Sequence, residues 1–408
     1  MASDDARRTR AARRAVAVVF FLNGAVFASW VPRIPEVKSA LGLGDAALGA
    51  ALAGPALGAV VSMAVTGALV ARLGSRPVTR AALVAFCVGP VLVGTASGWA
   101  ALFAVLTGWG AAMGALDVAM NSAGMTVQRR HGRPIMSGLH ACFSGGSLVG
   151  ALTGALAAHQ DLDVSVHLGA AGAIALVCGL AATRALLPAE HDVQAAGPAF
   201  ARPTRPLLVL SALAFAALLS EGAAADWSAV YLQETLGTGP GMAGAGYAAF
   251  AVTMTIGRLS GDRLVAAFGA PRVLGVLSAV AAAGFGGALL AAEPLPALAG
   301  LAVLGLGLAC VVPIVFTASA QTTEAPGPAI AAVSTCGYLG FIAGPPLIGA
   351  IAELTGLGPA LGVIAVLVAL LAVSAGAVRP AAGSADGQGA DRPVREGSAA
   401  APADEHAG

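Results

Sequence analysis

Long apolar runs fill the sequence between Ala15 and Val378, and only short basic or proline-rich connections separate them. The chain is 57% hydrophobic and 11% charged, whereas an average soluble domain carries about 25% charged residues. A chain of 408 residues with so few charges cannot give a soluble core a polar exterior. Runs of about 20 apolar residues instead match helices that cross a bilayer. The composition therefore predicts an all-α integral membrane protein.

Charge clusters and Pro/Gly breaks divide the apolar region into twelve candidate spans. They lie at residues 13–33, 45–71, 78–97, 99–127, 134–158, 165–187, 206–232, 241–264, 272–292, 295–319, 326–352 and 357–378. We expect five parts in the chain. These are a cytoplasmic basic tail at 1–12, a six-helix bundle at 13–187, a cytoplasmic linker at 188–205, a second six-helix bundle at 206–378 and a disordered cytoplasmic tail at 379–408.

The distribution of basic residues supports this count. With twelve spans and the N-terminus inside, Arg33 and Lys38 are the only two of the 22 Arg and Lys residues on the outer side. The others fall on the inner side, as the positive-inside rule requires. The arginine-rich N-terminus has no convincing cleavage pattern and is typical of an uncleaved first span. We therefore expect a multi-pass protein of the bacterial plasma (inner) membrane with both termini in the cytoplasm.

The sequence gives no indication of a metal site, a cofactor or an enzyme. Its five cysteines lie inside apolar runs, without Cys-x-x-Cys or Cys/His spacing. The patterns H-E-x-x-H, G-x-S-x-G and G-x-x-x-x-G-K-[ST] are absent, so ATP coupling within this chain is not expected. The net charge of +1 does not indicate a nucleic-acid partner. We expect a monomer.

The two halves of the chain echo each other near the second and eighth spans. Residues 67–76 read GALVARLGSR, which is similar to the loop motif G-x-L-x-D-R-x-G-R-R of the major facilitator superfamily, with Ala71 in place of Asp. In the second half Asp262-Arg263 is present, but the next glycine, Gly269, is displaced by several residues. The resemblance covers essentially the whole chain. It implies the fold of that superfamily, with twelve transmembrane helices in two pseudo-symmetric six-helix bundles. The cytoplasmic gate motif that it implies consists of Gly67, Arg72, Gly74, Arg76, Asp262 and Arg263.

A narrower resemblance concerns three short segments and one motif. Residues 20–24 (FFLNG), 29–35 (SWVPRIP) and 221–227 (EGAAADW) resemble the branch that includes MosC-type, rhizopine-transport-like proteins. Asp117-x-x-x-Asn121 in the fourth span is similar to the Glu-x-x-x-Asn of fucose:proton symporters, in which the acid takes part in coupling. The resemblance implies a sugar-, polyol- or amino-sugar-like solute.

Three acids interrupt spans where bilayer is expected, and they are the candidates for proton coupling. Asp117 and Asn121 are spaced i, i+4 and share one helix face. Helix rise places Asp117 about 18 Å, and Glu221 about 22 Å, from the cytoplasmic ends of their spans, which is near mid-depth. Asp226 lies about 7 Å farther out. Because burial favours the neutral form of a carboxyl, such an acid can bind and release a proton. The alternative is a fixed ion pair or an interhelical hydrogen bond.

A further group of polar and aromatic side chains could contact a solute. The amide of Asn23 can donate and accept hydrogen bonds, although an interhelical contact is an equal alternative. His140 could titrate or be a satisfied interior histidine. Trp30 and Trp227 could each belong to an aromatic belt or stack on a sugar ring. The candidate solute-binding residues are Asn23, Trp30, Asn121, His140, Trp227 and Tyr338.

Three functions remain open from the sequence. The first is a proton-coupled secondary transporter of a small polar organic solute, with alternating access around a mid-membrane site. The second is proton-antiport efflux of a small amphipathic compound. The third, from another class, is a non-transporting membrane sensor. The expected partners are a small-molecule solute, protons and the lipid bilayer.

Overall fold

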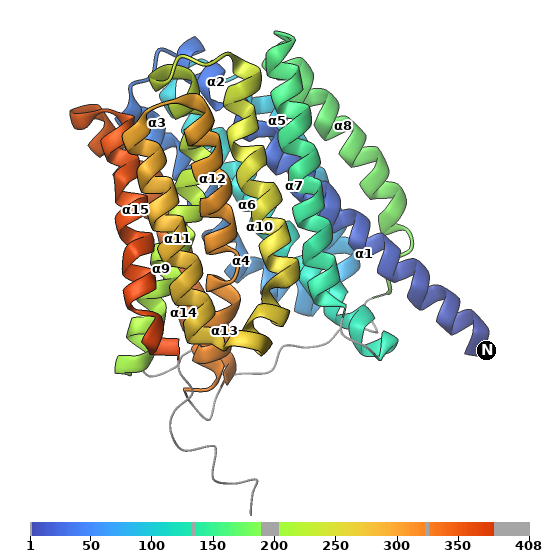
Figure 1. Ribbon diagram of the computed structural model, residues 1–408. Coiled ribbons are helices and arrows are strands. Elements are labelled where there is room, and N and C mark those ends of the chain that lie inside the picture. The colour runs from blue at the N-terminus through green and yellow to red at the C-terminus, as the bar shows by residue number, and fades with distance from the viewer. Residues whose placement is uncertain (1, 133–134, 189–203, 323–325, 379–408) are drawn as a thin grey trace, which may run out of the picture.

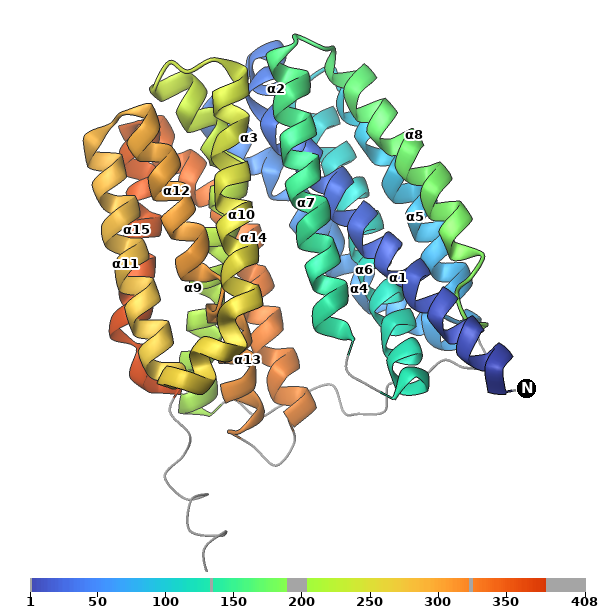
Figure 2. The ribbon, with the colours of Figure 1, turned by 45° about the vertical axis from the view of Figure 1, so that its right-hand side comes forward.

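The computed structural model describes residues 2–132, 135–188, 204–322 and 326–378. Within these ranges the chain forms helices and no strands (Figure 1), and the helices are arranged as two bundles (Figure 2). The predicted C-terminal tail at 379–408 lies outside the described residues. The predicted linker at 188–205 does so too, except for residues 188, 204 and 205.

The first six spans form the N-terminal half. Their elements are α1 (Ala2–Trp30), η1 (Val31–Arg33), α2 (Ile34–Ala40), α3 (Asp45–Leu52), α4 (Gly54–Leu73), α5 (Ser75–Val93), α6 (Trp99–His131), α7 (Met136–His159) and α8 (Val164–Thr183). The other six spans form the C-terminal half. Their elements are α9 (Arg205–Val230), η3 (Tyr231–Thr235), α10 (Pro240–Phe268), α11 (Ala270–Ala291), α12 (Pro294–Leu308), α13 (Val311–Ala320), α14 (Pro326–Thr355), α15 (Leu357–Val373) and η4 (Ala375–Val378).

The twelve predicted spans are confirmed within the described residues. Ten are long and apolar enough to cross a membrane. The other two are α10, which has 29 residues and three charged side chains, and α15, which has 17 residues. Prolines explain why the second and tenth spans are broken into two helices. Pro55 and Pro313 lack the N–H that would continue the backbone ladder, and each follows a break closely.

Glycines allow the first and fifth helices of each half to pack with their backbones in contact. A Cβ on Gly146 or Gly150 of α7 would lie 1.9 or 2.1 Å from a carbonyl oxygen of α1. In the C-terminal half, a Cβ on Gly340 of α14 would lie 2.4 Å from the carbonyl oxygen of Phe215 on α9. Such small-residue contacts replace the hydrophobic effect as the packing device in lipid. The same device in both halves supports their pseudo-symmetry.

The two halves meet at one end of the molecule and diverge toward the other (Figure 2). We call the end with Arg33 and Lys38 the outer end, and the end with the remaining arginine clusters the inner end. At the outer end α3 packs on α14, and α7 packs on α10. A Cβ on Gly49 would lie 2.4 Å from the carbonyl oxygen of Pro345, and one on Gly349 would lie 2.4 Å from that of Asp45. The outer closure is therefore a contact between backbones.

Two polar links also cross between the halves at the outer end. The Lys38 ammonium lies 2.6 Å from Asp45 of its own half and forms an ion pair with Glu234 of the other half. The N–H of Ala46, in the first turn of α3, donates to the Glu353 carboxylate across the interface at 3.2 Å. Anions are favoured at a helix N-terminus because its first N–H groups lack partners. One cation and one helix end therefore hold acids of the opposite half.

We expect Gly49→Ala to weaken the outer closure, because the added methyl group would collide with the backbone of Pro345. Overpacking of this kind costs about 1–3 kcal/mol. The thermal unfolding midpoint of the purified protein should fall. Gly108→Ala is the matched control, since a Cβ there meets no atom within 4 Å. Equal midpoints for the two variants would contradict the proposed backbone contact.

We expect Lys38→Met to favour separation of the outer ends, because Asp45 and Glu234 would then face each other without a cation. Since Glu234 is partly exposed, the change should be about 1 kcal/mol, roughly fivefold in the ratio of closed to open molecules. Spin labels at Ser39→Cys and Thr235→Cys in a cysteine-free background report the distance between the halves. Lys38→Arg should retain the wild-type distance distribution. If Lys38→Met retains it as well, the ion pair does not hold the closure.

Candidate functional site

Asp117 lies near the middle of α6, and its carboxylate has an amide rather than a cation as its partner. The Asn121 side-chain N–H groups donate to the Asp117 carboxylate at 3.1 Å and to its backbone carbonyl at 2.8 Å. No basic side chain pairs with this carboxylate in the part of the chain that the structure describes. The two residues therefore share a face, as the spacing predicts, and an ionised Asp117 carries an uncompensated negative charge.

Glu221 of α9 has a different environment, because it forms an ion pair with Arg258 of α10. One guanidinium nitrogen, Nη2, lies 3.2 and 3.4 Å from the two carboxylate oxygens. The charge pattern counts Arg258 among the basic residues of the cytoplasmic side, and the predicted span 241–264 contains it. Helix α10 continues for ten residues beyond Arg258, to Phe268, so Arg258 lies about 15 Å from the inner end of its helix.

Two tyrosines and a histidine bring the polar groups of the two halves to one region. The Tyr338 hydroxyl on α14 interacts electrostatically with both Asp117 and Glu221. His140 on α7 interacts with Arg258 and packs edge-to-face on a phenylalanine ring, with 5.2 Å between ring centroids. Tyr247 interacts with Glu221 and Arg258. We call this set the central polar cluster, which consists of Asp117, Asn121, His140, Glu221, Tyr247, Arg258 and Tyr338.

Tyr247 and Arg258 were not predicted as site residues from the sequence. They are eleven residues apart on α10, which is about three helical turns, so they share a face. That spacing is the sequence signal that could have identified the two residues as a pair on one helix face. It does not identify Glu221 as the partner of Arg258, because Glu221 is on another helix.

The remaining predicted acid, Asp226, lies beside the cluster. Its side chain is partly buried and interacts electrostatically with Tyr247. Within the described residues its carboxylate has no hydrogen bond or ion pair. The next residue, Trp227, is fully buried, and its indole N–H has no partner there. Trp30 is buried as well. Burial argues against an aromatic belt at a lipid interface for either tryptophan.

Asn23 of α1 lies next to α6 in the interior of the N-terminal half. Its side chain is 2% exposed, and its N–H group lies 3.7 Å from the Met120 sulfur. Its oxygen is buried without a partner among the described residues. An unsatisfied buried acceptor costs about 1–3 kcal/mol. Asn23 could therefore accept a hydrogen bond after a rearrangement, and among the described residues no hydrogen bond joins it to the central polar cluster.

The six residues of the predicted gate motif lie at the inner end. In this conformation none of them pairs with the other half among the described residues. Gly74 ends α4 with φ +88°, where only glycine is unstrained. The Arg76 guanidinium donates to the backbone carbonyl of Arg184 at 3.1 Å, which ties α5 to α8 within one half. For Gly67, a Cβ would meet open space, and Arg72 is exposed.

The second copy of the motif is shifted. Gly269 ends α10 with φ +81° and is the counterpart of Gly74. Asp262 lies seven residues before that glycine, which is the position of Gly67 in the first half. The sequence comparison of the two halves predicts Asp262-Arg263 as the motif's Asp-Arg pair and Gly269 as displaced. The structure instead shows that the glycine is in register and the charged pair is about one turn early.

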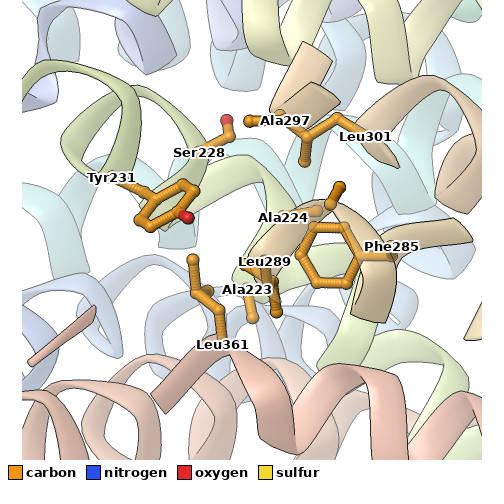
Figure 3. Close-up of a pocket in the computed structure, with 10 residues that line it drawn as sticks. Ala223, Ala224, Ser228, Tyr231, Phe285, Leu289, Ala297, Leu301 and Leu361 are labelled. Carbon is orange, nitrogen blue, oxygen red and sulfur yellow. The ribbon is translucent and has the colours of Figure 1, made fainter. Parts of the chain in front are cut away.

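Cavities are present in the described part of the C-terminal half, including the following two. One is enclosed and small, at about 10 Å³, and its wall includes Ala223, Tyr231 and Phe285 (Figure 3). It has room for about one water molecule. The other, of about 530 Å³, lies between α10, α11 and α13, with Arg258 and Asp262 in its wall. Its volume is in the range of small-molecule pockets, roughly 300–1,000 Å³.

Comparisons with known proteins agree with this architecture. A family model described as Major Facilitator Superfamily matches residues 16–225. An uncharacterized MFS-type transporter of Yersinia pestis is 38% identical over 365 residues, which cover 88% of this chain and 94% of the relative. The membrane protein MosC of Rhizobium meliloti is 36% identical over 353 residues, which cover 85% of each chain.

Solved structures show the same fold. The nucleoside transporter NupG aligns with a TM-score of 0.69 at 16% identity and covers 90% of this chain and 98% of its own. A bacterial homolog of the human lysosomal transporter Spinster aligns with a TM-score of 0.71 at 15% identity, covering 91% of this chain and 96% of its own. These proteins are membrane transporters rather than enzymes. On these grounds the chain belongs to the major facilitator superfamily, as a multi-pass membrane transporter of small solutes.

Proposed function

We propose that this protein is a proton-coupled secondary transporter of a small polar organic solute that is sugar-, polyol- or amino-sugar-like. The observation that carries the proposal is the central polar cluster, in which acids of both halves face a common region. We place the protein in a bacterial inner membrane as a monomer, with both termini and the inner end in the cytoplasm. The arginine distribution supports this orientation.

Alternating access follows from where the two halves touch. They meet at the outer end and diverge toward the inner end (Figure 2), and we infer that the central polar cluster is reached from the inner side in this conformation. Rocking of one half against the other would open the outer end instead. The outer contacts suit such a change, because glycine backbones and two polar links can separate without disturbing the interior of either half.

The proton step falls on Asp117 in this proposal. Its amide partner leaves its negative charge uncompensated, so protonation would remove a net charge from the interior. An isolated charge in a dry, closed state costs several kcal/mol, and a neutral carboxyl avoids that cost. Glu221 starts from a neutral pair with Arg258, so its protonation has to displace a cation. Asp226 remains a third candidate proton site.

The solute class is supported by the groups that surround the site. Hydrogen-bond donors and acceptors lie close together there. They belong to the Asn121 amide, the Tyr247 and Tyr338 hydroxyls and the Glu221–Arg258 pair. A hydroxylated molecule needs both, because each hydroxyl group donates one hydrogen bond and accepts others. The MosC-type resemblance points in the same direction.

We expect Asp117→Asn to reduce solute accumulation driven by a pH gradient by at least about tenfold. Solute exchange without a gradient should persist. The reason is that an amide cannot carry the proton but preserves the shape of the site. The solute would first be identified by a thermal-shift screen of sugars, polyols and amino sugars, since ligand binding raises the melting point. Uptake would then be measured in proteoliposomes with an imposed pH gradient.

Asp117→Glu and the remote, exposed Glu293→Gln are the controls, and both should retain gradient-driven uptake. Gradient-driven accumulation by Asp117→Asn would show that Asp117 is not the coupling acid. Outward solute movement against proton entry would indicate efflux by antiport. Binding without any flux of the bound solute would favour a sensor.

A further inference from the structure

The contact between Arg258 and Glu221 is a loose one. A strong arginine–carboxylate pair uses two guanidinium nitrogens in parallel, but here Nη2 alone contacts both carboxylate oxygens, at 3.2 and 3.4 Å. The other guanidinium nitrogens of Arg258 have no hydrogen-bond partner among the described residues. The Arg258 side chain is 36% exposed and that of Glu221 is 24% exposed. Ion pairs with this degree of exposure contribute little to stability, so the partner can be exchanged.

A second acid lies within reach of the same guanidinium. Asp262 is four residues after Arg258 on α10, and side chains spaced i, i+4 on a helix are neighbours. Both residues line the 530 Å³ cavity, and both act electrostatically on the Cys310 thiol. The Asp262 carboxylate is exposed, and within the described residues it has no hydrogen bond or ion pair. Arg258 thus contacts one acid and has a second acid four residues away on its own helix, which is unpaired among the described residues.

We propose that Asp262 is the alternate partner of Arg258, which exchanges Glu221 for Asp262 when Glu221 binds a proton. Before the exchange, Glu221 and Arg258 form a neutral pair. After it, protonated Glu221 is neutral, and Arg258 and Asp262 form the neutral pair. No step leaves the arginine uncompensated. Asp262 lies about one helical turn, roughly 6 Å, closer to the inner end than Arg258 along α10, so the cation moves toward that end. Asp262 is thus a positioning residue for the proton-coupled transport proposed above, on which this inference rests.

The other groups around the pair come from several helices. His140 of α7, Tyr247 of α10 and Cys310 interact electrostatically with Arg258, and Tyr338 of α14 does so with Glu221. Of these side-chain types, histidine has the ordinary pKa nearest to neutral pH. A protonated His140 would repel Arg258 and would also favour the exchange. A test must therefore separate the contribution of His140 from that of Asp262.

The direct test is an experimental structure of Glu221→Gln in lipid nanodiscs. The amide mimics the protonated acid, so the Arg258 guanidinium should lie within ion-pair distance of the Asp262 carboxylate. If the guanidinium remains on the substituted side chain of α9, or moves to a group other than Asp262, the proposal is wrong. The double variant Glu221→Gln/Asp262→Asn is the control, and in it Arg258 should leave the Asp262 position.

A second test reads the exchange through the conformation of a chain that retains Glu221. Spin labels at Arg129→Cys and Arg272→Cys, in a cysteine-free background, report the separation of the inner ends as a function of pH. Asp262→Asn should move the pH midpoint of any change by about one unit to more acidic pH, because Arg258 then has no alternative to Glu221. Asp262→Glu should restore the midpoint, and Glu293→Gln should not alter it.

The shift should persist in a His140→Gln background if Asp262 rather than His140 is responsible. An Asp262→Asn midpoint equal to the wild-type value would overturn the exchange. Failure of the proposed function is distinguishable from this outcome. Proton-driven uptake that is unchanged in Asp262→Asn would leave transport standing and refute the exchange. Absence of proton-driven uptake, with Arg258 on Asp262 in the Glu221→Gln structure, would refute proton-coupled transport and support the exchange.

Discussion

An ionised side chain inside a helix bundle costs several kcal/mol unless a partner or a wet interior compensates it, and this constraint organises the protein. Lys38 is held between acids, and Arg33 contacts Glu36 and the backbone carbonyl of Leu162. Arg258 contacts Glu221. Asp117 differs from these, since the partner of its carboxylate is an amide. A site where charge is left uncompensated is where gain and loss of a proton have the largest energetic effect.

Close backbone packing gives the second constraint. Glycines let α7 pack on α1 and α14 on α9 inside the halves, and they let α3 approach α14 between the halves. Within a half these contacts run along the length of two helices, whereas between the halves they gather at the outer end. Two closely packed bundles that contact each other at one end have the geometry that alternating access requires.

The sequence was sufficient to predict the twelve spans, because span length and arginine asymmetry are set by the bilayer itself. It also predicted that Asp117 and Asn121 share a face, since that depends only on helix periodicity. It could not reveal that Arg258 meets Glu221, because that contact depends on how two helices rotate against each other. The displacement of Asp262 was hidden for a related reason, since only the dihedral angles of Gly74 and Gly269 show which residues correspond. The burial of Trp30 and Trp227 likewise depends on tertiary packing.

The central claim is that solute and proton move together through one site. The most direct measurement is the external pH of a weakly buffered suspension of proteoliposomes when solute is added without an imposed gradient. Proton symport predicts an alkaline change outside, in fixed proportion to the solute that enters, and its loss when a protonophore is present. Solute entry with no change in external pH would contradict it.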